Sequence, residues 1–381
     1  MDRRRFRRPC GRLAAAAVVA LLAPTTRARG DDAGPIGFAP GSRAAQAKAE
    51  AGALAVPTPE RARAWLRTLT EEPHVAGTPA DRTTAEFVRD RLREWGWQAD
   101  LAEYEVLLNY PTGAPILEIV RPEPQTLPVT EAPLAADKDS ASPAAFPAFH
   151  GYGVSGEVTG QVVYANYGRP EDFAALDRLG VEVKDRIVLV RYGELFRGLK
   201  VQNAQKRGAR GVLIYSDPAD DGYAKGDVYP FGPYRPGSAI QRGSVQFLSL
   251  QPGDPSTPDG PSIKGAKRLP IDRSHGFPRR VPVFVTRQGI AQGEAIGVEG
   301  ADAVAAWEKA TGLVRTEVFA AIPSLPISYE AARPILAALG GPNVPGGWQG
   351  GLPLAYHVGP GPVEVRCAVA MDYQIRPIWN V

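Results

Sequence analysis

The chain has 381 residues, which is enough for two or three domains with buried cores. Hydrophobic residues make up 44% of it, so the 41 glycines and 37 prolines indicate many loops rather than a disordered chain. The formal net charge is +3, but residues 1–28 hold seven arginines and one aspartate, and the remainder has 37 basic against 40 acidic residues. This balance gives no support to a nucleic-acid-binding protein.

The first 28 residues are predicted to be an export signal. Arginines precede an apolar run, Leu13–Ala23, which leads to a small-residue cleavage site near Ala28. Arg3-Arg4-Arg5-Phe6 fits the pattern of the twin-arginine route. The apolar run has 11 residues, too few to span a bilayer. We therefore expect a periplasmic or secreted protein without membrane attachment after cleavage; an uncleaved anchor is the alternative.

Cysteine usage follows from this prediction. Cys10 lies inside the signal, so Cys367 is the single cysteine of the mature chain. One cysteine cannot form an intramolecular disulfide, and the stability of the mature protein must come from packing.

The segment up to residue 110 is predicted to be largely helical. Residues 29–45 are rich in Gly, Ala and Pro and form a linker. Thr58 before Pro59 is an N-cap that opens a helix, and the apolar stripe of this helix is expected to consist of Ala62, Trp65, Leu66 and Leu69. The further elements expected here are a loop at 71–80, an amphipathic helix at 80–95 that Gly96 stops, and a strand at 98–108 that Asn109-Tyr110-Pro111 ends. The residues of this helix expected to face inward are Ala85, Val88, Leu92 and Trp95.

The middle of the chain contains the clearest pattern, a strand–helix–strand unit. Ile187–Val190 and Gly211–Tyr215 are short β-branched or apolar runs, and the segment between them has the length and punctuation of one helix. Such a unit implies a parallel strand pair. Before it we expect a strand at 116–120, a surface excursion at 122–147, a strand at 156–165 and a helix at 170–179.

Beyond this unit the pattern weakens. Asp217–Asp227 has the acidic spacing of a calcium loop, but no Glu closes it at the twelfth position, so we interpret it as turns. The other expected elements are a regular stretch at 240–250, a strand at 281–286, helices at 301–311 and 329–339, and closing strands at 354–358, 363–371 and 375–381.

Candidate ligands for a metal are sparse. The four histidines, His74, His150, His275 and His357, stand far apart, and no H-E-x-x-H, H-x-D or C-x-x-C pairing is present. His74 lies beside two glutamates but has no second His at ligand spacing, so we expect it to make a structural hydrogen bond. There is no G-x-S-x-G elbow either. The sequence therefore predicts no catalytic and no metal-binding residues in this chain.

Three stretches resemble the glutamate carboxypeptidase II family, which includes the transferrin receptor. They are LTEEPHVAGTPADRTTAEFVRDRL (69–92), RYGELFRGLKVQNAQKRGARGVLIYSDPAD (191–220) and AIQRGSVQFLSLQPGDPSTPDGPS (239–262), and they occur in the family's order. The resemblance covers about 45–381. It implies an α/β (α+β) fold: a protease-associated β-sandwich or barrel-like domain with flanking helices, plus the first helices and strands of an incomplete aminopeptidase-like domain.

The resemblance also implies domain boundaries. After the signal (1–28) and linker (29–45), residues 46–110 would begin the peptidase domain. Residues 111–365 would form an apical domain with its protease-associated core at about 150–262, and 366–381 would be the first strands of a truncated peptidase domain.

Relatives of this kind are zinc peptidases, and the resemblance implies that their zinc ligands and general base lie downstream of residue 381. The chain ends IRPIWNV, inside an expected apolar strand. We therefore expect a truncated polypeptide that neither binds zinc nor hydrolyses peptides alone. We also expect it to leave apolar surface of 46–110 and 366–381 uncovered, with dimerisation a property of the full-length protein.

The resemblance assigns two substrate-binding residues. Arg197 matches the Arg that binds a substrate carboxylate, so the expected partner is a peptide with a C-terminal carboxylate. A guanidinium suits that task because it offers two parallel donors to two oxygens. Ser244 stands where the family has an Asn and offers a hydroxyl in place of an amide. Arg191 also follows a strand's carboxyl end, where α/β sheets bind ligands.

Thr257 and Gly260 match a loop that donates oxygens to calcium in some relatives. The carboxylate ligands of that site would lie beyond residue 381, so we expect no tight calcium binding here. Two alternatives to the peptidase fragment stay open: a stand-alone exported module that binds peptides or carboxylates, and a non-catalytic interaction protein like the transferrin receptor.

Overall fold

The computed structural model describes residues 37–135, 137–248, 253–257, 260–268, 285–286, 289–290 and 320–381. The signal, residues 29–36 of the linker and the helix expected at 301–311 lie outside these residues, and of the strand expected at 281–286 only β9 (Val285–Thr286), paired with β10 (Gly289–Ile290), is described. Contacts divide the chain into two units, Met1–Arg67 and Thr68–Val381. Of the described helices, none is both long and apolar enough to span a membrane.

The described part of the first unit, from residue 37 on, is mostly helical. It contains the short 3-10 helix η1 (Pro40–Ser42), helix α1 (Arg43–Leu54) and most of helix α2 (Pro59–Leu69). The Thr58 hydroxyl accepts a hydrogen bond from the Arg61 amide at 3.2 Å, which confirms Thr58 as the N-cap of α2. Neither α1 nor α2 contains a buried residue, so the apolar stripe expected along α2 is not covered by the described residues.

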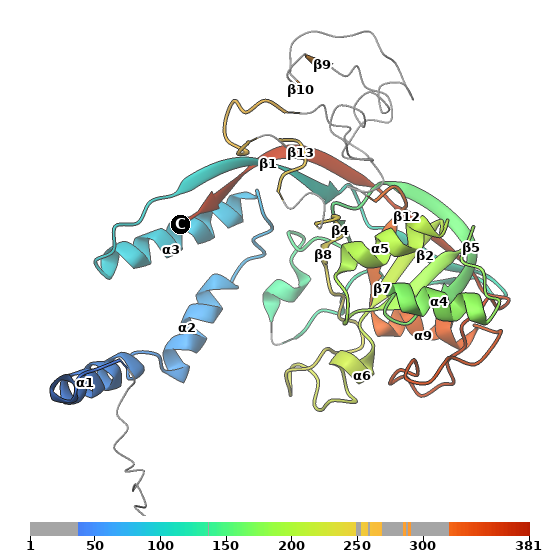
Figure 1. The fold of residues 1–381 in the computed structure, drawn as a ribbon, viewed down its shortest axis with the longest axis horizontal. Coiled ribbons are helices and arrows are strands. Elements are labelled where there is room, and N and C mark those ends of the chain that lie inside the picture. The colour runs from blue at the N-terminus through green and yellow to red at the C-terminus, as the bar shows by residue number, and fades with distance from the viewer. Residues whose placement is uncertain are drawn as a thin grey trace, which may run out of the picture. The chain divides into compact units, whose positions relative to one another are not determined.

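The core of the second unit is a seven-stranded mixed sheet in the order β11-β7-β6-β5-β12-β2-β3 (Figure 1). Its strands are β2 (Ile116–Arg121), β3 (Gln125–Thr126), β5 (Gly156–Tyr164), β6 (Ile187–Arg191), β7 (Gly211–Tyr215), β11 (Ser324–Ile327) and β12 (Glu364–Val369). Strands β5, β6, β7 and β11 run parallel, whereas β12 pairs antiparallel with both β5 and β2. The mixed α/β fold class expected from the sequence is confirmed.

Burial explains why the parallel strands could be predicted from the sequence. Every residue of β6 and β7 is buried, as expected of parallel strands that are covered on both faces. Helices α4 (Pro170–Arg178) and α5 (Arg197–Lys206) connect β5 to β6 and β6 to β7. Two successive right-handed crossovers put both helices on one face, and Figure 1 draws them next to each other. The strand–helix–strand prediction is confirmed.

A second feature is the two-stranded ribbon of β1 (Ala102–Pro111) and β13 (Met371–Asn380), against which α3 (Pro79–Glu94) lies (Figure 1). The prediction that Asn109-Tyr110-Pro111 ends the strand was wrong. The Asn109 side chain does not turn its own backbone, because its amide group donates to the His150 carbonyl at 3.1 Å and its oxygen accepts from the Tyr152 amide. The ribbon therefore runs to Pro111, opposite Met371.

Two further expectations for the second unit were wrong. No strand forms at 354–358, because the amide of Val358 bonds to the Pro342 carbonyl of a neighbouring loop instead of a strand ladder. The stretch expected at 240–250 reduces, over its described part, to β8 (Gly243–Ser244), which pairs with β4 (His150–Gly151). The remaining elements are η2 (Lys138–Ala141), α6 (Pro218–Asp221) and α9 (Tyr329–Ala337).

The predicted domain boundaries stay predictions. The predicted boundary after residue 365 falls inside β12, which belongs to the seven-stranded sheet, and β12 leads directly into β13 of the ribbon.

Candidate carboxylate-binding site

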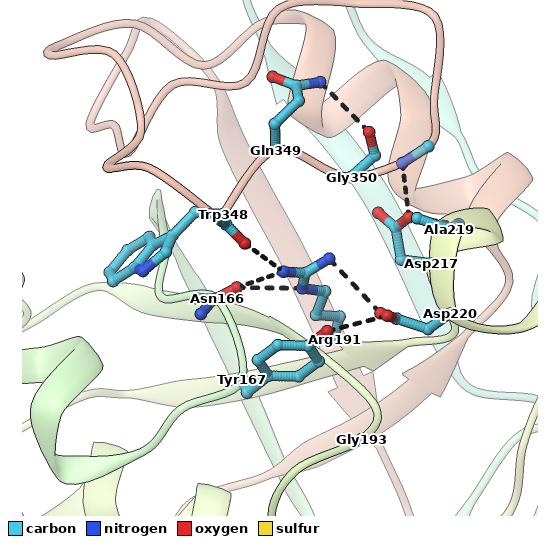
Figure 2. A network of polar contacts seen from close by, with 12 residues as sticks. Asn166, Tyr167, Arg191, Gly193, Asp217, Ala219, Asp220, Trp348, Gln349 and Gly350 are labelled. Atoms are coloured by element: carbon cyan, nitrogen blue, oxygen red, sulfur yellow. Dashed lines mark hydrogen bonds and ion pairs between the residues drawn. The ribbon is translucent and has the colours of Figure 1, made fainter.

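The loops at the carboxyl ends of β5, β6 and β7 gather a network of polar side chains (Figure 2). This is the edge of a parallel sheet where ligands usually bind. Arg191 ends β6, Asn166 and Tyr167 follow β5, and Asp220 follows β7. The question at this edge is which of its cations is available to a ligand.

The Arg191 side chain is buried and bonded to other groups of the protein. Its side chain is 3% exposed, and it donates to Asn166 Oδ1 through Nε (3.0 Å) and NH2 (2.7 Å) and to the Gly347 carbonyl (3.0 Å). NH1 lies 3.5 Å from Asp220 Oδ2, and the guanidinium stacks 4.1 Å from the centre of the Tyr167 ring. Figure 2 shows it enclosed by these groups. Arg191 therefore holds three loops together and is not free to bind a ligand.

Arg197, at the start of α5, has a different environment. Its Nε donates to the Ser244 carbonyl oxygen at 3.1 Å, and its guanidinium lies 5.2 Å from the centre of the Phe196 ring. Among the described residues no carboxylate lies within ion-pair distance of it. The side chain is only partly buried. The Nε bond fixes the direction of the guanidinium and leaves its two terminal nitrogens for a ligand.

Two glycines make this arrangement sterically possible. A Cβ at Gly243 would overlap the Arg197 guanidinium, and a Cβ at Gly198 would overlap the carbonyl oxygen of Gln246. The two motifs Phe196-Arg197-Gly198 and Gln241-Arg242-Gly243 thus interlock, each glycine giving room to the other segment.

The structure brings the two predicted site residues together, but through the backbone of Ser244. Its carbonyl accepts a hydrogen bond from Arg197 Nε, while its hydroxyl accepts one from the backbone amide of Gln246 at 3.1 Å. The hydroxyl can still donate its proton to a further acceptor. Ser244 therefore orients Arg197 and offers one additional donor.

A buried histidine that the sequence did not single out supports this site. His150 Nδ1 lies 2.9 Å from Ser324 Oγ, and Nε2 lies 3.3 Å from the Tyr192 hydroxyl. Burial, and then the positive charge of Arg197, lower the pKa of His150 to about 3. The ring is therefore neutral at pH 7 and adds no competing charge. Its strand, β4, is the partner of β8, which carries Gly243 and Ser244.

Lys200 is a second buried group that sequence reasoning missed. Its Nζ donates to the carbonyls of Tyr167 (2.6 Å) and Gly193 (2.7 Å), and burial lowers its pKa to about 7. Helical spacing puts Lys200 on the same face as the buried Ala204, four residues later, and this was the available signal. The ammonium ties the loops that follow β5 and β6.

The predicted metal-related residues have local partners. His74 Nδ1 lies 3.0 Å from the Glu72 carbonyl, so the expected structural hydrogen bond is present. Thr257 bonds to the Ser262 hydroxyl at 2.6 Å, and the adjacent Asp254 pairs with Arg268 at 3.0 Å. In the described part of the chain, no three His, Cys, Asp or Glu side chains form a group that could hold a metal ion.

Comparison with known proteins gives the family. Residues 158–248, which include Arg197 and Ser244, match the PA domain. A probable glutamate carboxypeptidase of Arthroderma benhamiae is 37% identical over 329 residues, which cover 83% of this chain and 39% of that protein. The chain belongs to the glutamate carboxypeptidase family.

Other relatives of this glutamate carboxypeptidase-family chain include the mouse aminopeptidase NAALADL1, 31% identical over 84% of this chain and 40% of that protein. Among solved structures, the aminopeptidase from Aneurinibacillus sp. strain AM-1 is matched over 82% of this chain and 44% of its own, with 14% identity and a TM-score of 0.36. The chain thus spans about two fifths of the length of the curated relatives it matches.

Proposed function

We propose that this chain is the part of an exported zinc-dependent peptidase that binds the terminal carboxylate of a peptide substrate through Arg197. The observation that carries the proposal is the anchored guanidinium, with Nε bonded to the Ser244 carbonyl and no carboxylate partner among the described residues. A fixed guanidinium can present two parallel donors to the two oxygens of one carboxylate. The names of the relatives support a peptide substrate.

The roles of the neighbouring residues follow from their contacts. Ser244 holds the guanidinium in one direction, and its hydroxyl can donate to the bound carboxylate. His150 stays neutral, so a bound anion meets the charge of Arg197 without a second cation beneath it. The network around Arg191 keeps the loops at this sheet edge fixed.

Zinc chemistry belongs to another part of the enzyme in this proposal. The described residues contain no group that fits a zinc ion, so we derive no catalytic step from them. We propose that the chain by itself binds peptides without hydrolysing them. Zinc analysis of the purified chain, together with hydrolysis of an acetylated Asp-Glu dipeptide, tests this part; near-stoichiometric zinc with turnover would contradict it.

The carboxylate site is tested separately by calorimetric titration with acetylated Asp-Glu dipeptide and with its C-terminal amide. We expect the free acid to bind and the amide to bind at least about tenfold more weakly, because the amide lacks the charged terminal carboxylate. Arg197→Ala should abolish the preference for the acid. Arg210→Ala, which removes an exposed cation beyond the end of the same helix, is the matched control. An unchanged preference in Arg197→Ala would rule the site out.

Export is proposed from the signal-like composition of residues 1–28. Expression of the full chain in a bacterium and N-terminal sequencing of the product tests it. We expect a mature chain that begins close to residue 29 and is found outside the cytoplasm. Recovery of uncleaved chain in the cytoplasm would contradict the proposal.

A further inference from the structure

An open groove, distinct from the Arg197 site, lies between three segments that are distant in the sequence. It has a volume of about 770 Å³ and is formed by the loop at 73–75, the excursion at 131–149 and the segment from 221 to 242. This volume is within the range of roughly 300–1,000 Å³ that is typical of ligand sites. Arg197 and Ser244 are not part of its lining.

Aromatic side chains and prolines line a large part of this groove. Phe146, Phe149, Tyr229 and Tyr234 line it together with prolines such as Pro236. Phe146 is fixed by edge-to-face contacts with Phe149 (5.8 Å between ring centres) and Tyr110 (5.6 Å). Because Phe146 and Phe149 are held by these contacts, a ligand that stacks on them meets a preformed surface.

The charged side chains of the groove neutralise one another. Arg242 forms a two-point ion pair with Glu131, in which NH2 lies 2.8 Å from Oε2. Arg235 Nε lies 2.7 Å from Asp221 Oδ2. The lining contains no other Asp, Glu, Lys or Arg. A charged ligand would find no unmatched partner here, so the groove is complementary to a neutral ligand.

The segment that follows α6 presents aromatic side chains to solvent at the rim. Tyr229 lines the groove and is 48% exposed, and Phe231, two residues later, is 87% exposed. Figure 1 shows this loop projecting away from the sheet. Exposed aromatic rings beside a groove are typical of a recognition surface rather than of a packed core.

We infer that this groove binds a neutral, proline-rich peptide segment in the extended polyproline II conformation. Such segments dock in grooves lined by aromatic rings, and their rigidity limits the entropy lost on binding. The groove is open to solvent on one side, so a peptide segment can reach the rings that line it. This site does not depend on the carboxylate site, because it recognises side-chain rings within a peptide and not a terminal carboxylate.

The test uses peptides that cannot engage Arg197. Acetyl-Ala-Pro-Pro-Ala-Pro-Pro-amide and acetyl-Ala-Gly-Ser-Ala-Gly-Ser-amide are titrated into the full chain by calorimetry. We expect saturable binding of the proline peptide and none of the Gly-Ser peptide. Tyr229→Ala should weaken binding about fivefold to tenfold, because it removes one stacking ring. Ala239→Trp should block binding by filling the groove.

Two controls separate this site from the rest of the surface. Phe231→Ala removes a more exposed ring of the same loop that does not line the groove, and it should leave the affinity unchanged. Arg197→Ala should also leave it unchanged, although that variant loses the preference for a free carboxylate. The inference is overturned if the proline peptide fails to bind, if the Gly-Ser peptide binds equally well, or if Tyr229→Ala binds like the unchanged chain.

Discussion

At the scale of single residues, the contrast between Arg191 and Arg197 decides the site. Arg191 ends β6 and Arg197 begins α5 six residues later, so their place at this sheet edge favoured both as ligand residues, and only the family resemblance assigned Arg197 to the substrate. Arg191 is buried among Asn166, Asp220 and Tyr167, whereas Arg197 is anchored at one nitrogen only. Whether an arginine side chain can bind a ligand depends on which polar groups of other loops already contact it. This information is spread over residues from 166 to 347 and is not contained in any local pattern.

Gly243→Ala is expected to disturb the site directly. The added Cβ would overlap the Arg197 guanidinium, so the side chain or the β8 backbone must move. We expect a loss of carboxylate binding of at least tenfold and a destabilisation of about 1–3 kcal/mol from overpacking. Calorimetric titration and urea unfolding measure the two effects. Gly253→Ala is the control, because a Cβ there meets no atom within 4 Å.

His150 should make the stability of the fold depend on pH. Its pKa is lowered from 6.5 to about 3 in the folded protein, so the unfolded chain binds the proton more readily. This contribution is fully retained above pH 6.5 and is lost as the pH falls towards 3, with a slope of up to about 1.4 kcal/mol per pH unit.

The measurement is the free energy of unfolding in urea between pH 7.5 and about 4. The variant His150→Gln, which keeps a polar side chain but does not titrate, should show a shallower decline than the unchanged chain. Equal slopes in the two proteins would contradict the assignment of this pH dependence to His150.

At the scale of elements, the buried parallel strands could be predicted and the irregular segments could not. Ile187–Val190 and Gly211–Tyr215 could be predicted because each is a short apolar run bounded by turn or charged residues. The strand expected at 354–358 failed because its backbone partners belong to a loop at 342–344, which no local pattern reveals. Likewise, Asn109 looked like a strand breaker until its contacts with the 150–152 turn were known.

Asp217 joins two of these irregular segments. Its buried carboxylate accepts from the hydroxyls of Tyr215 (2.9 Å) and Tyr356 (2.7 Å) and from the amides of Ala219 (2.9 Å) and Gly351 (2.7 Å). The loop after β7 is thereby fixed to the loop before β12.

Asp217→Ala is expected to destabilise the protein by about 3–5 kcal/mol, because two buried hydroxyls and two partly buried amides lose their acceptor. Urea unfolding measures the loss. Asp100→Ala, at an exposed aspartate that forms an ion pair with Arg93, should cost less than about 1 kcal/mol. A similar loss in both variants would show that Asp217 does not have this role.

At the scale of the whole molecule, the second unit presents large apolar side chains beside its ribbon. Trp95 and Trp97, at the end of α3, are 58% and 68% exposed. Contiguous exposed apolar groups favour association. The sequence predicted an amphipathic helix at 80–95 with Trp95 inward, and within the described residues only Ala85 of α3 is buried. Periodicity identified the apolar face but not what covers it.

We therefore expect the purified chain to self-associate with increasing concentration. Trp97→Ser should shift the equilibrium towards monomer in sedimentation velocity experiments, because it removes an exposed ring. Gln98→Ser, a polar replacement at the next exposed residue, is the control. A monomer at all concentrations, or equal association in the two variants, would show that this face does not drive contact.

The interlocked glycines also constrain how related sequences can diverge. Because any side chain at position 243 occupies the space of the Arg197 guanidinium, the two positions cannot change independently. A lineage that replaced this glycine would have to shorten residue 197 in the same evolutionary step or lose the anchored cation. Among homologues, a larger residue at 243 should therefore co-vary with a small side chain at 197, and such pairs would mark descendants that have abandoned the ancestral ligand.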